Sequence, residues 1–95
     1  MKVEYSKRAL ADIRKIAIDS REAFGDRIAE ALEARIRAIV ERISQLPASA
    51  PEIVQRPGMH SVPMRQYPYK IFYRVLEDRI RIVHVRHTSR RQWIG

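Results

Sequence analysis

The sequence predicts an α+β fold in which an N-terminal pair of helices packs on one face of a small antiparallel β-sheet. Three observations support this prediction. Apolar residues recur every three or four positions in the first half of the chain, which is typical of helices with one buried face. Apolar and polar residues alternate in the last third, as they do in strands. The 95 residues have room for a single domain, 1–95.

The N-terminal elements are predicted to be a strand and a helix. Alternation over residues 2–5 indicates the strand, and Ser6 follows at a position suited to a helix N-cap. The helix carries an apolar stripe, with Ile16 beside it: Leu10, Ile13, Ala17 and Phe24. Gly25 is expected to end this helix, because glycine enters the left-handed backbone region at little cost.

A second helix is predicted to begin with Asp26 as its N-cap and to end before Pro47. It has the most regular apolar stripe in the chain, formed by Ile28, Leu32, Ile36, Ile39, Ile43 and Leu46. Because only Gly25 separates the two helices, we expect them to run antiparallel as an αα-hairpin.

The C-terminal half is expected to begin with a proline-rich loop over residues 47–58, containing a short extended piece at 52–56. Three strands should follow, at 59–66, 69–76 and 79–87. Pro63 cannot donate to a central ladder, so the first of them is expected at an edge of the sheet. Glu77 and Asp78 should form the turn between the last two, which gives the element order β-α-α-β-β-β.

Composition excludes several classes of protein. The chain has no cysteine, which rules out a disulfide scaffold, a thiolate zinc site and a cysteine nucleophile. No apolar run approaches the ~20 residues of a membrane span, and the N-terminus lacks the apolar region of a signal peptide. We therefore expect a soluble cytoplasmic protein with no membrane partner.

The positive charge is concentrated towards the C-terminus. The net charge is +8, and 15 of the 19 basic residues are arginine. Residues 1–50 contain ten bases and eight acids, whereas residues 51–95 contain nine bases and three acids. Such asymmetry is typical of proteins that meet an anionic partner, either nucleic acid or an acidic protein. The alternative is a solubilising surface without a specific partner.

The residues give little support for an enzyme of metabolism. The acidic residues of the C-terminal half lie in the predicted loop and turn, and no glycine-rich phosphate loop or nucleophile elbow is present. His84 and His87 are three positions apart on a strand, so their side chains should point to opposite faces and not share a metal. We expect no metal and no cofactor, and ordinary buried or hydrogen-bonded roles for the two histidines.

Arginines and aromatic residues are interleaved along the predicted sheet. The arginines are Arg65, Arg74, Arg81, Arg86, Arg90 and Arg91, and the aromatic residues are Tyr67, Tyr69, Tyr73 and Trp93. Guanidinium groups bind phosphates and aromatic rings stack on unpaired bases, so this mixture suits RNA or single strands. The competing interpretation places Tyr69 and Tyr73 in the core and treats residues 90–93 as a frayed terminus.

Four segments follow one another in a distinctive order: YSKRALADIRKIA, a helix ending in Leu46-Pro47, YKIFYRV, and RIRIVHVRH followed by an arginine pair. In this order and spacing the chain resembles the RelE/ParE superfamily, the toxins of bacterial type II toxin–antitoxin modules. The resemblance covers nearly the whole chain. It implies the β-α-α-β-β-β fold, a growth-arresting activity, and an antitoxin that wraps the toxin with a helix and an extended segment.

One branch of that superfamily, the RelE-like toxins, consists of ribosome-dependent mRNA endonucleases. Arg65 and Arg90 occupy the places of two arginines that hold the scissile phosphate in these enzymes. The chain lacks the tyrosine that RelE-like enzymes use near the C-terminus, and Arg86 and His87 are the residues that could replace it. Under this interpretation the catalytic residues would be Arg65, Arg86, His87 and Arg90.

The ParE-like branch resembles the chain more closely, because its members also close the last strand on histidine and continue into an arginine-rich end, here HVRHTSRRQW. These toxins are understood to poison DNA gyrase without being nucleases. We therefore predict a gyrase inhibitor; the alternatives are mRNA cleavage on ribosomes and a plain nucleic-acid-binding module. The expected target-binding residues are Arg65, Arg86, His87, Arg90, Arg91 and Trp93.

The resemblance also implies a partner that neutralises the toxin. An acidic antitoxin would offset the positive charge and cover apolar surface beside the helical hairpin, forming a hetero-oligomer with the toxin. The residues expected to contact it are Leu10, Ile13, Ile36, Val40 and Phe72.

Overall fold

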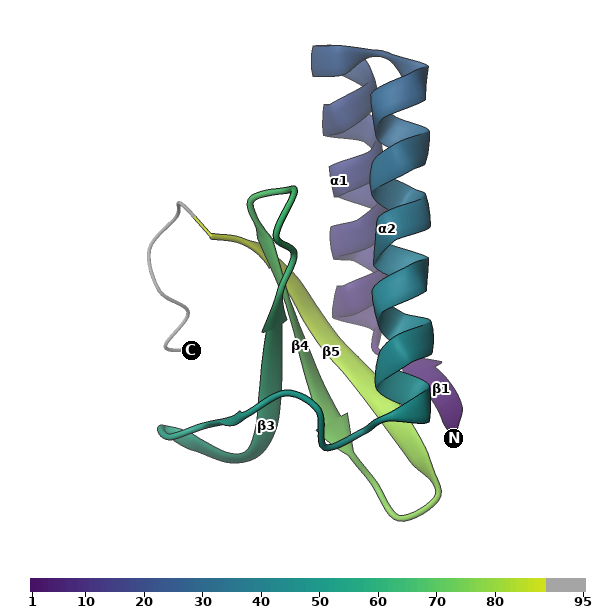
Figure 1. Ribbon diagram of the computed structural model, residues 1–95. Helices are drawn as coiled ribbons and strands as arrows, with labels where there is room; N and C mark the ends of the chain where they lie inside the picture. The colour runs from purple at the N-terminus through teal and green to yellow at the C-terminus, as the bar shows by residue number, and fades with distance from the viewer. Residues whose placement is uncertain (89–95) are drawn as a thin grey trace.

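The computed structural model describes residues 1–88, which form a helical hairpin packed against one face of a five-stranded sheet (Figure 1). The elements are β1 (Lys2–Tyr5), α1 (Lys7–Phe24), α2 (Asp26–Gln45), β2 (Glu52–Ile53), β3 (Arg56–Pro63), β4 (Tyr69–Val75) and β5 (Arg79–His87). The predicted α+β fold with an N-terminal αα-hairpin is confirmed.

Local chemistry explains the ends of the helices. Ser6 is the N-cap of α1, and its side-chain oxygen accepts a hydrogen bond of 2.9 Å from the backbone N–H of Ala9. Gly25, at φ 90°, both ends α1 and serves as the N-cap of α2. Asp26 was predicted to be that N-cap, but it lies one position inside the helix and instead accepts a hydrogen bond from Arg21 Nε at 2.9 Å.

The sheet has the strand order β1-β5-β4-β3-β2. All neighbouring strands are antiparallel except β1, which runs parallel to β5 with Val3 beside Ile80. The sheet is therefore mixed, whereas the sequence predicted an antiparallel one. Alternation shows which residues share a face but carries no information on strand direction, so it did not reveal the parallel pair.

The C-terminal strands agree with the prediction apart from their ends. Strand β3 occupies residues 56–63 and not 59–66, and the short extended piece at 52–56 contributes the two-residue strand β2. The turn between β4 and β5 is closed by a hydrogen bond of 2.8 Å from the Leu76 N–H to the Arg79 carbonyl. The outer neighbour of β3 is β2, which has only two residues, so most of β3 lies at the edge of the sheet. This agrees with the position expected for a strand that contains Pro63.

The core lies between the hairpin and the sheet. Its main residues are Leu32, Ile36, Ile39, Val40 and Ile43 of α2 and Ile71, Tyr73, Ile80, Ile82 and Val85 of the sheet. The predicted α2 stripe is confirmed in its middle, but Ile28 and Leu46 at its ends are exposed. In Figure 1 the tip of the hairpin, where α1 ends and α2 begins, extends well beyond the sheet.

The stripe predicted for α1 is rotated in the structure. The inward face consists of Ala9, Ile13, Ile16 and Ser20, while Leu10 and Phe24 point outward and are 50% and 71% exposed. Small residues such as alanine and serine allow a helix to approach its neighbour closely, and a search for large apolar side chains misses them.

Tyr73 holds the loop after α2 against the sheet. Its hydroxyl donates a hydrogen bond of 2.8 Å to the Pro47 carbonyl, and its ring, fully buried, stacks on His60 at 5.0 Å. His60 Nδ1 in turn donates to the Ala50 carbonyl at 2.7 Å. Burial raises the pKa of the Tyr73 hydroxyl above the ordinary value of 10.0.

This arrangement predicts a loss of stability at alkaline pH. The folded chain keeps the Tyr73 proton at pH values where the unfolded chain releases it, so the free energy of unfolding should fall as pH rises past about 10. Tyr73→Phe should reduce that fall and cost about 1 kcal/mol at neutral pH through the lost hydrogen bond. Urea unfolding at pH 7 to 11 measures both effects. Tyr67→Phe is the control, and equal behaviour of the two variants would contradict the prediction.

Candidate target-binding face and helix groove

The sheet face that points away from the helices is strongly basic. Strands β3, β4 and β5 contain no aspartate or glutamate. Side chains alternate along a strand, so Lys70, Phe72 and Arg74 lie on the face opposite to the core residues Ile71 and Tyr73. We call this surface the open face.

Strand pairing places like charges opposite each other on the open face. Lys70 lies opposite Arg86, and Arg74 lies opposite Arg81. Like charges in direct cross-strand pairs are destabilising. Arg81 has a carboxylate within reach, with Glu4 Oε1 at 3.8 Å from its Nε, but the other three form no ion pair within residues 1–88. The positive charge of these two cation pairs is therefore not neutralised by carboxylates in the described residues, apart from the contact of Arg81 with Glu4.

A stacked aromatic pair lies between the two cation pairs. Phe72 faces His84 across β4 and β5, and their rings stack with centroids 5.8 Å apart. Both side chains are buried, at 8% and 6% exposed. The middle of the open face therefore presents neither ring freely to solvent.

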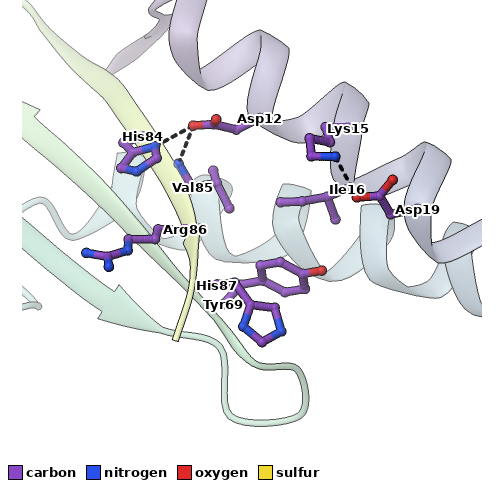
Figure 2. A pocket seen from close by; sticks show the side chains of 9 residues that line it. All are labelled: Asp12, Lys15, Ile16, Asp19, Tyr69, His84, Val85, Arg86 and His87. Atoms are coloured by element: carbon purple, nitrogen blue, oxygen red, sulfur yellow. Dashed lines mark hydrogen bonds and ion pairs between the residues drawn. The ribbon is translucent and has the colours of Figure 1, made fainter. Parts of the chain in front are cut away.

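The carboxylate of Asp12 reaches from α1 to the edge of β5 (Figure 2). Its Oδ2 accepts one hydrogen bond from His84 Nδ1 at 2.5 Å and another from the Val85 backbone N–H at 3.0 Å. Strand β1 ends at Tyr5, so no strand is present there to accept the Val85 N–H. Asp12 takes the place of that missing strand and fixes His84 in the tautomer protonated at Nδ1.

An irregularity in β5 makes this contact possible. Phe72 pairs with His84 but Tyr73 pairs with Ile82, so Val83 is an extra residue in β5, and its carbonyl accepts a hydrogen bond of 2.8 Å from Ser6 Oγ. A β-bulge of this kind shifts the alternation by one position. Ile82 and Val85 can thus both enter the core while His84 turns to the open face.

Beyond Asp12 a groove of about 320 Å³ opens between α1 and β5. It is lined by Asp12, Lys15, Ile16, Asp19, Tyr69, His84, Val85, Arg86 and His87. Lys15 Nζ forms an exposed ion pair with Asp19 at 3.2 Å, and the Tyr69 and His87 rings meet edge to face with centroids 5.1 Å apart. In Figure 2, Arg86 lies on the other side of β5 from Tyr69.

Three of the predicted target-binding residues lie at one end of the sheet. Arg65 is exposed in the connection between β3 and β4, and Arg86 and His87 are half-buried near the end of β5. The Thr88 N–H donates to the Pro68 carbonyl at 2.7 Å, which brings that connection beside the end of β5. The remaining three, Arg90, Arg91 and Trp93, lie outside the described residues.

The residues predicted to contact an antitoxin divide into two groups. Leu10 is exposed and Ile13 is half-buried on α1, so both can meet another molecule. Ile36, Val40 and Phe72 are 3%, 5% and 8% exposed, which leaves them little surface to offer. An apolar stripe has the same spacing whether it faces the protein's own sheet or a partner, so the pattern alone did not separate the groups.

Sequence reasoning missed Asp12 entirely. Its position three residues after Ala9 and four before Ile16 places it on the inward face of α1, where it is the acidic residue among apolar and small ones. A carboxylate on a buried helix face needs a hydrogen-bond donor as its partner. The position of Asp12 on that face could therefore have indicated a contact with another element. His84 was expected to be buried or hydrogen-bonded, which the structure confirms.

Metal-ligand clusters and membrane-spanning helices are both absent from the part of the chain that the structure describes. Among residues 1–88, no three histidine, cysteine or acidic side chains are grouped so that they could hold a metal ion. Neither helix in this range combines the length and apolar character needed to cross a membrane.

The fold is shared with solved toxin structures. A chain of the chromosomal ParDE TA system from P. aeruginosa matches with a TM-score of 0.80 and 19% identity, over 92% of this chain and 95% of that one. The isolated E. coli RelE toxin matches with a TM-score of 0.64 and 20% identity, over 96% and 87%. The intact E. coli RelBE toxin-antitoxin complex matches with a TM-score of 0.56 and 17% identity, over 95% and 98%. These similarities show that the chain shares their fold, a small α+β domain.

The family follows from the sequence itself. Residues 3–92 match the model of the ParE toxin of the type II toxin-antitoxin system parDE. The chain belongs to this family, and it is the toxin component of a type II toxin–antitoxin system. No curated protein matches it. The expected superfamily, and within it the ParE branch, are confirmed.

Proposed function

We propose that this toxin arrests bacterial growth by inhibiting DNA gyrase in the cytoplasm. Family membership over residues 3–92 is the observation that carries the proposal, since the matching family is the toxin of parDE. Arg65, Arg86 and His87 are the described part of the proposed target-binding surface, to which Arg90, Arg91 and Trp93 belong as sequence-based predictions.

The chemistry of the open face supports inhibition by binding over cleavage of RNA. A ribonuclease needs an acid and a base on either side of the reacting phosphate. No carboxylate stands on β3, β4 or β5, His84 Nδ1 is engaged by Asp12, and His87 packs against Tyr69. The arginines there can bind an anion, but the described residues bring no acid–base pair to them.

We further propose that an acidic antitoxin neutralises the toxin. The matched structures include the ParDE TA system and the RelBE toxin-antitoxin complex, which supports a protein partner of this kind. Leu10 and Ile13 give the antitoxin apolar surface on α1, and the net charge of +8 favours an acidic sequence. The proposed assembly is a hetero-oligomer of toxin and antitoxin.

A supercoiling assay with purified gyrase tests the proposal. The wild-type toxin should inhibit supercoiling or increase gyrase-dependent DNA cleavage. Arg65→Glu combined with Arg86→Glu should raise the toxin concentration that gives half-maximal inhibition by about tenfold or more. This change is equivalent to about 1.4 kcal/mol of binding free energy. The control variant, Arg27→Glu with Arg35→Glu on the exposed surface of α2, carries the same charge change and should behave as wild type.

The same preparation distinguishes the alternative activity. If gyrase is unaffected and ribosome-bound mRNA is cut at defined codons, the protein is a RelE-like endonuclease and the gyrase proposal is wrong. Growth arrest on induced expression, with rescue by the antitoxin, is expected under both activities.

A further inference from the structure

We propose that the two cation pairs of the open face bind the phosphate backbone of duplex DNA, so that the toxin contacts the DNA on which gyrase acts. This inference rests on the proposed function and names a partner for the same face. The residues concerned are Lys70 with Arg86 and Arg74 with Arg81.

The first argument is the uncompensated charge. The two cross-strand pairs of basic side chains lower the stability of the free protein. Strands β3, β4 and β5 contain no aspartate or glutamate that could offset this repulsion. Of the four cations, only Arg81 has a carboxylate within 4 Å among the described residues, that of Glu4 on β1, and Glu4 also pairs with Arg79. An anionic partner on the open face removes this repulsion. The free energy that the repulsion costs the free sheet is then recovered on binding.

The second argument concerns the kind of anion. Protein interfaces have an apolar core surrounded by polar residues. The large apolar side chains that are exposed in the described residues are Met1, Leu10, Ile18, Phe24, Ile28, Leu46, Val54 and Val75. None of these belongs to the open face, because the alternation of β4 puts Val75 on the side of Tyr73. The part of the open face between the two cation pairs therefore offers charge without an exposed apolar centre, which suits a phosphate backbone better than a protein partner.

The third argument separates duplex DNA from single strands. Proteins that bind single-stranded nucleic acid stack its bases on accessible aromatic rings. Between the cation pairs the rings are those of Phe72 and His84, at 8% and 6% exposed, and they stack on each other. Of the rings that the sequence analysis named for base stacking, Tyr73 is fully buried, Tyr67 and Tyr69 are half-buried, and Trp93 lies outside the described residues.

Spacing is consistent with phosphates on the two sides of a groove. Lys70 and Arg74 are four residues apart on one strand, a separation of about 13 Å. The major groove of DNA is about 12 Å wide, so each cation pair can meet a phosphate of a different strand. The two rings between the pairs are buried and the contacts proposed are to phosphates, so binding should be independent of sequence.

Fluorescence anisotropy with a labelled duplex of mixed sequence tests the inference. Wild-type toxin should bind, and log K should fall against log salt with a slope of about −3 to −4, as expected for four phosphate contacts. Lys70→Gln with Arg74→Gln should weaken binding by about tenfold or more at low salt and reduce the slope by about 2. Arg27→Gln with Arg35→Gln, which loses the same charge from α2, should leave both quantities close to wild type.

Three results would overturn the inference: no duplex binding at low salt, equal losses in the two variants, or tighter binding of single-stranded DNA or RNA of the same length. The gyrase assay is read separately. Inhibition of gyrase without binding of free duplex would reject the DNA contact and retain the proposed function. Duplex binding that depends on Lys70 and Arg74, without inhibition of gyrase, would support the contact and reject that function.

Discussion

Asp12→Ala is expected to lower the free energy of unfolding by about 3 kcal/mol. The substitution removes the acceptor of two hydrogen bonds at once, from His84 Nδ1 and from the Val85 N–H. His84 is only 6% exposed, so water cannot easily replace the carboxylate. The stacking of His84 on Phe72 should loosen with it, which extends the effect from α1 to the open face.

Urea unfolding measures this loss, and two variants make the result specific. Asp12→Asn keeps an acceptor oxygen without the charge and should lose about half as much. Asp19→Ala removes an exposed carboxylate of the same helix, whose ion pair with Lys15 is worth at most about 1 kcal/mol. Equal stability of Asp12→Ala and Asp19→Ala would show that the contact with β5 contributes nothing.

Ile36→Ala should also cost about 3 kcal/mol, because it opens a cavity in the core at a side chain that is 3% exposed. Leu10→Ala, on the outer surface of α1, should change stability by no more than about 0.5 kcal/mol. Thermal or urea unfolding of the two variants side by side gives the comparison. Similar losses would mean that α1 is packed differently from the structure.

Leu10→Ala also tests the proposed antitoxin surface. Leu10→Ala should weaken binding of the cognate antitoxin by about tenfold while the toxin stays folded. Val54→Ala, which removes another exposed apolar side chain far along the chain, 90% exposed against 50% for Leu10, is the control. Titration calorimetry measures both affinities, and an unchanged affinity for Leu10→Ala would remove that residue from the surface.

Periodicity predicted the helices and strands because each of those patterns reflects burial of one face. The middle of α2 and the turn at Glu77 and Asp78 followed directly from it. Three features depend on contacts between distant segments and left no periodic trace. These are the parallel direction of β1, the extra residue Val83 in β5, and the rotation of α1 that turns Leu10 outward.

The candidate site was predicted as separate residues and not as an arrangement. Arg65 and Arg86 were identified among the arginines of the C-terminal half, and the resemblance to RelE/ParE toxins added His87 and gave all three their expected roles. That Lys70 faces Arg86, or that Asp12 holds His84, follows only from strand register and from where α1 crosses the edge of β5. Register is set by the hydrophobic pattern and the turns of the whole sheet, so no local motif contains it.

The position of β1 beside β5 also determines when the toxin can form during synthesis. The first strand pairs with residues 79–82, and Ser6 bonds to Val83, 77 positions later in the chain. A growing chain can assemble the helical hairpin early, since those contacts are local, but the edge of the sheet stays unpaired until the last strand emerges. The open face, built from β4 and β5, thus forms only after the residues of β5, up to His87, have been made. A nascent chain that has not yet reached residue 79 therefore carries the helical hairpin without the open face.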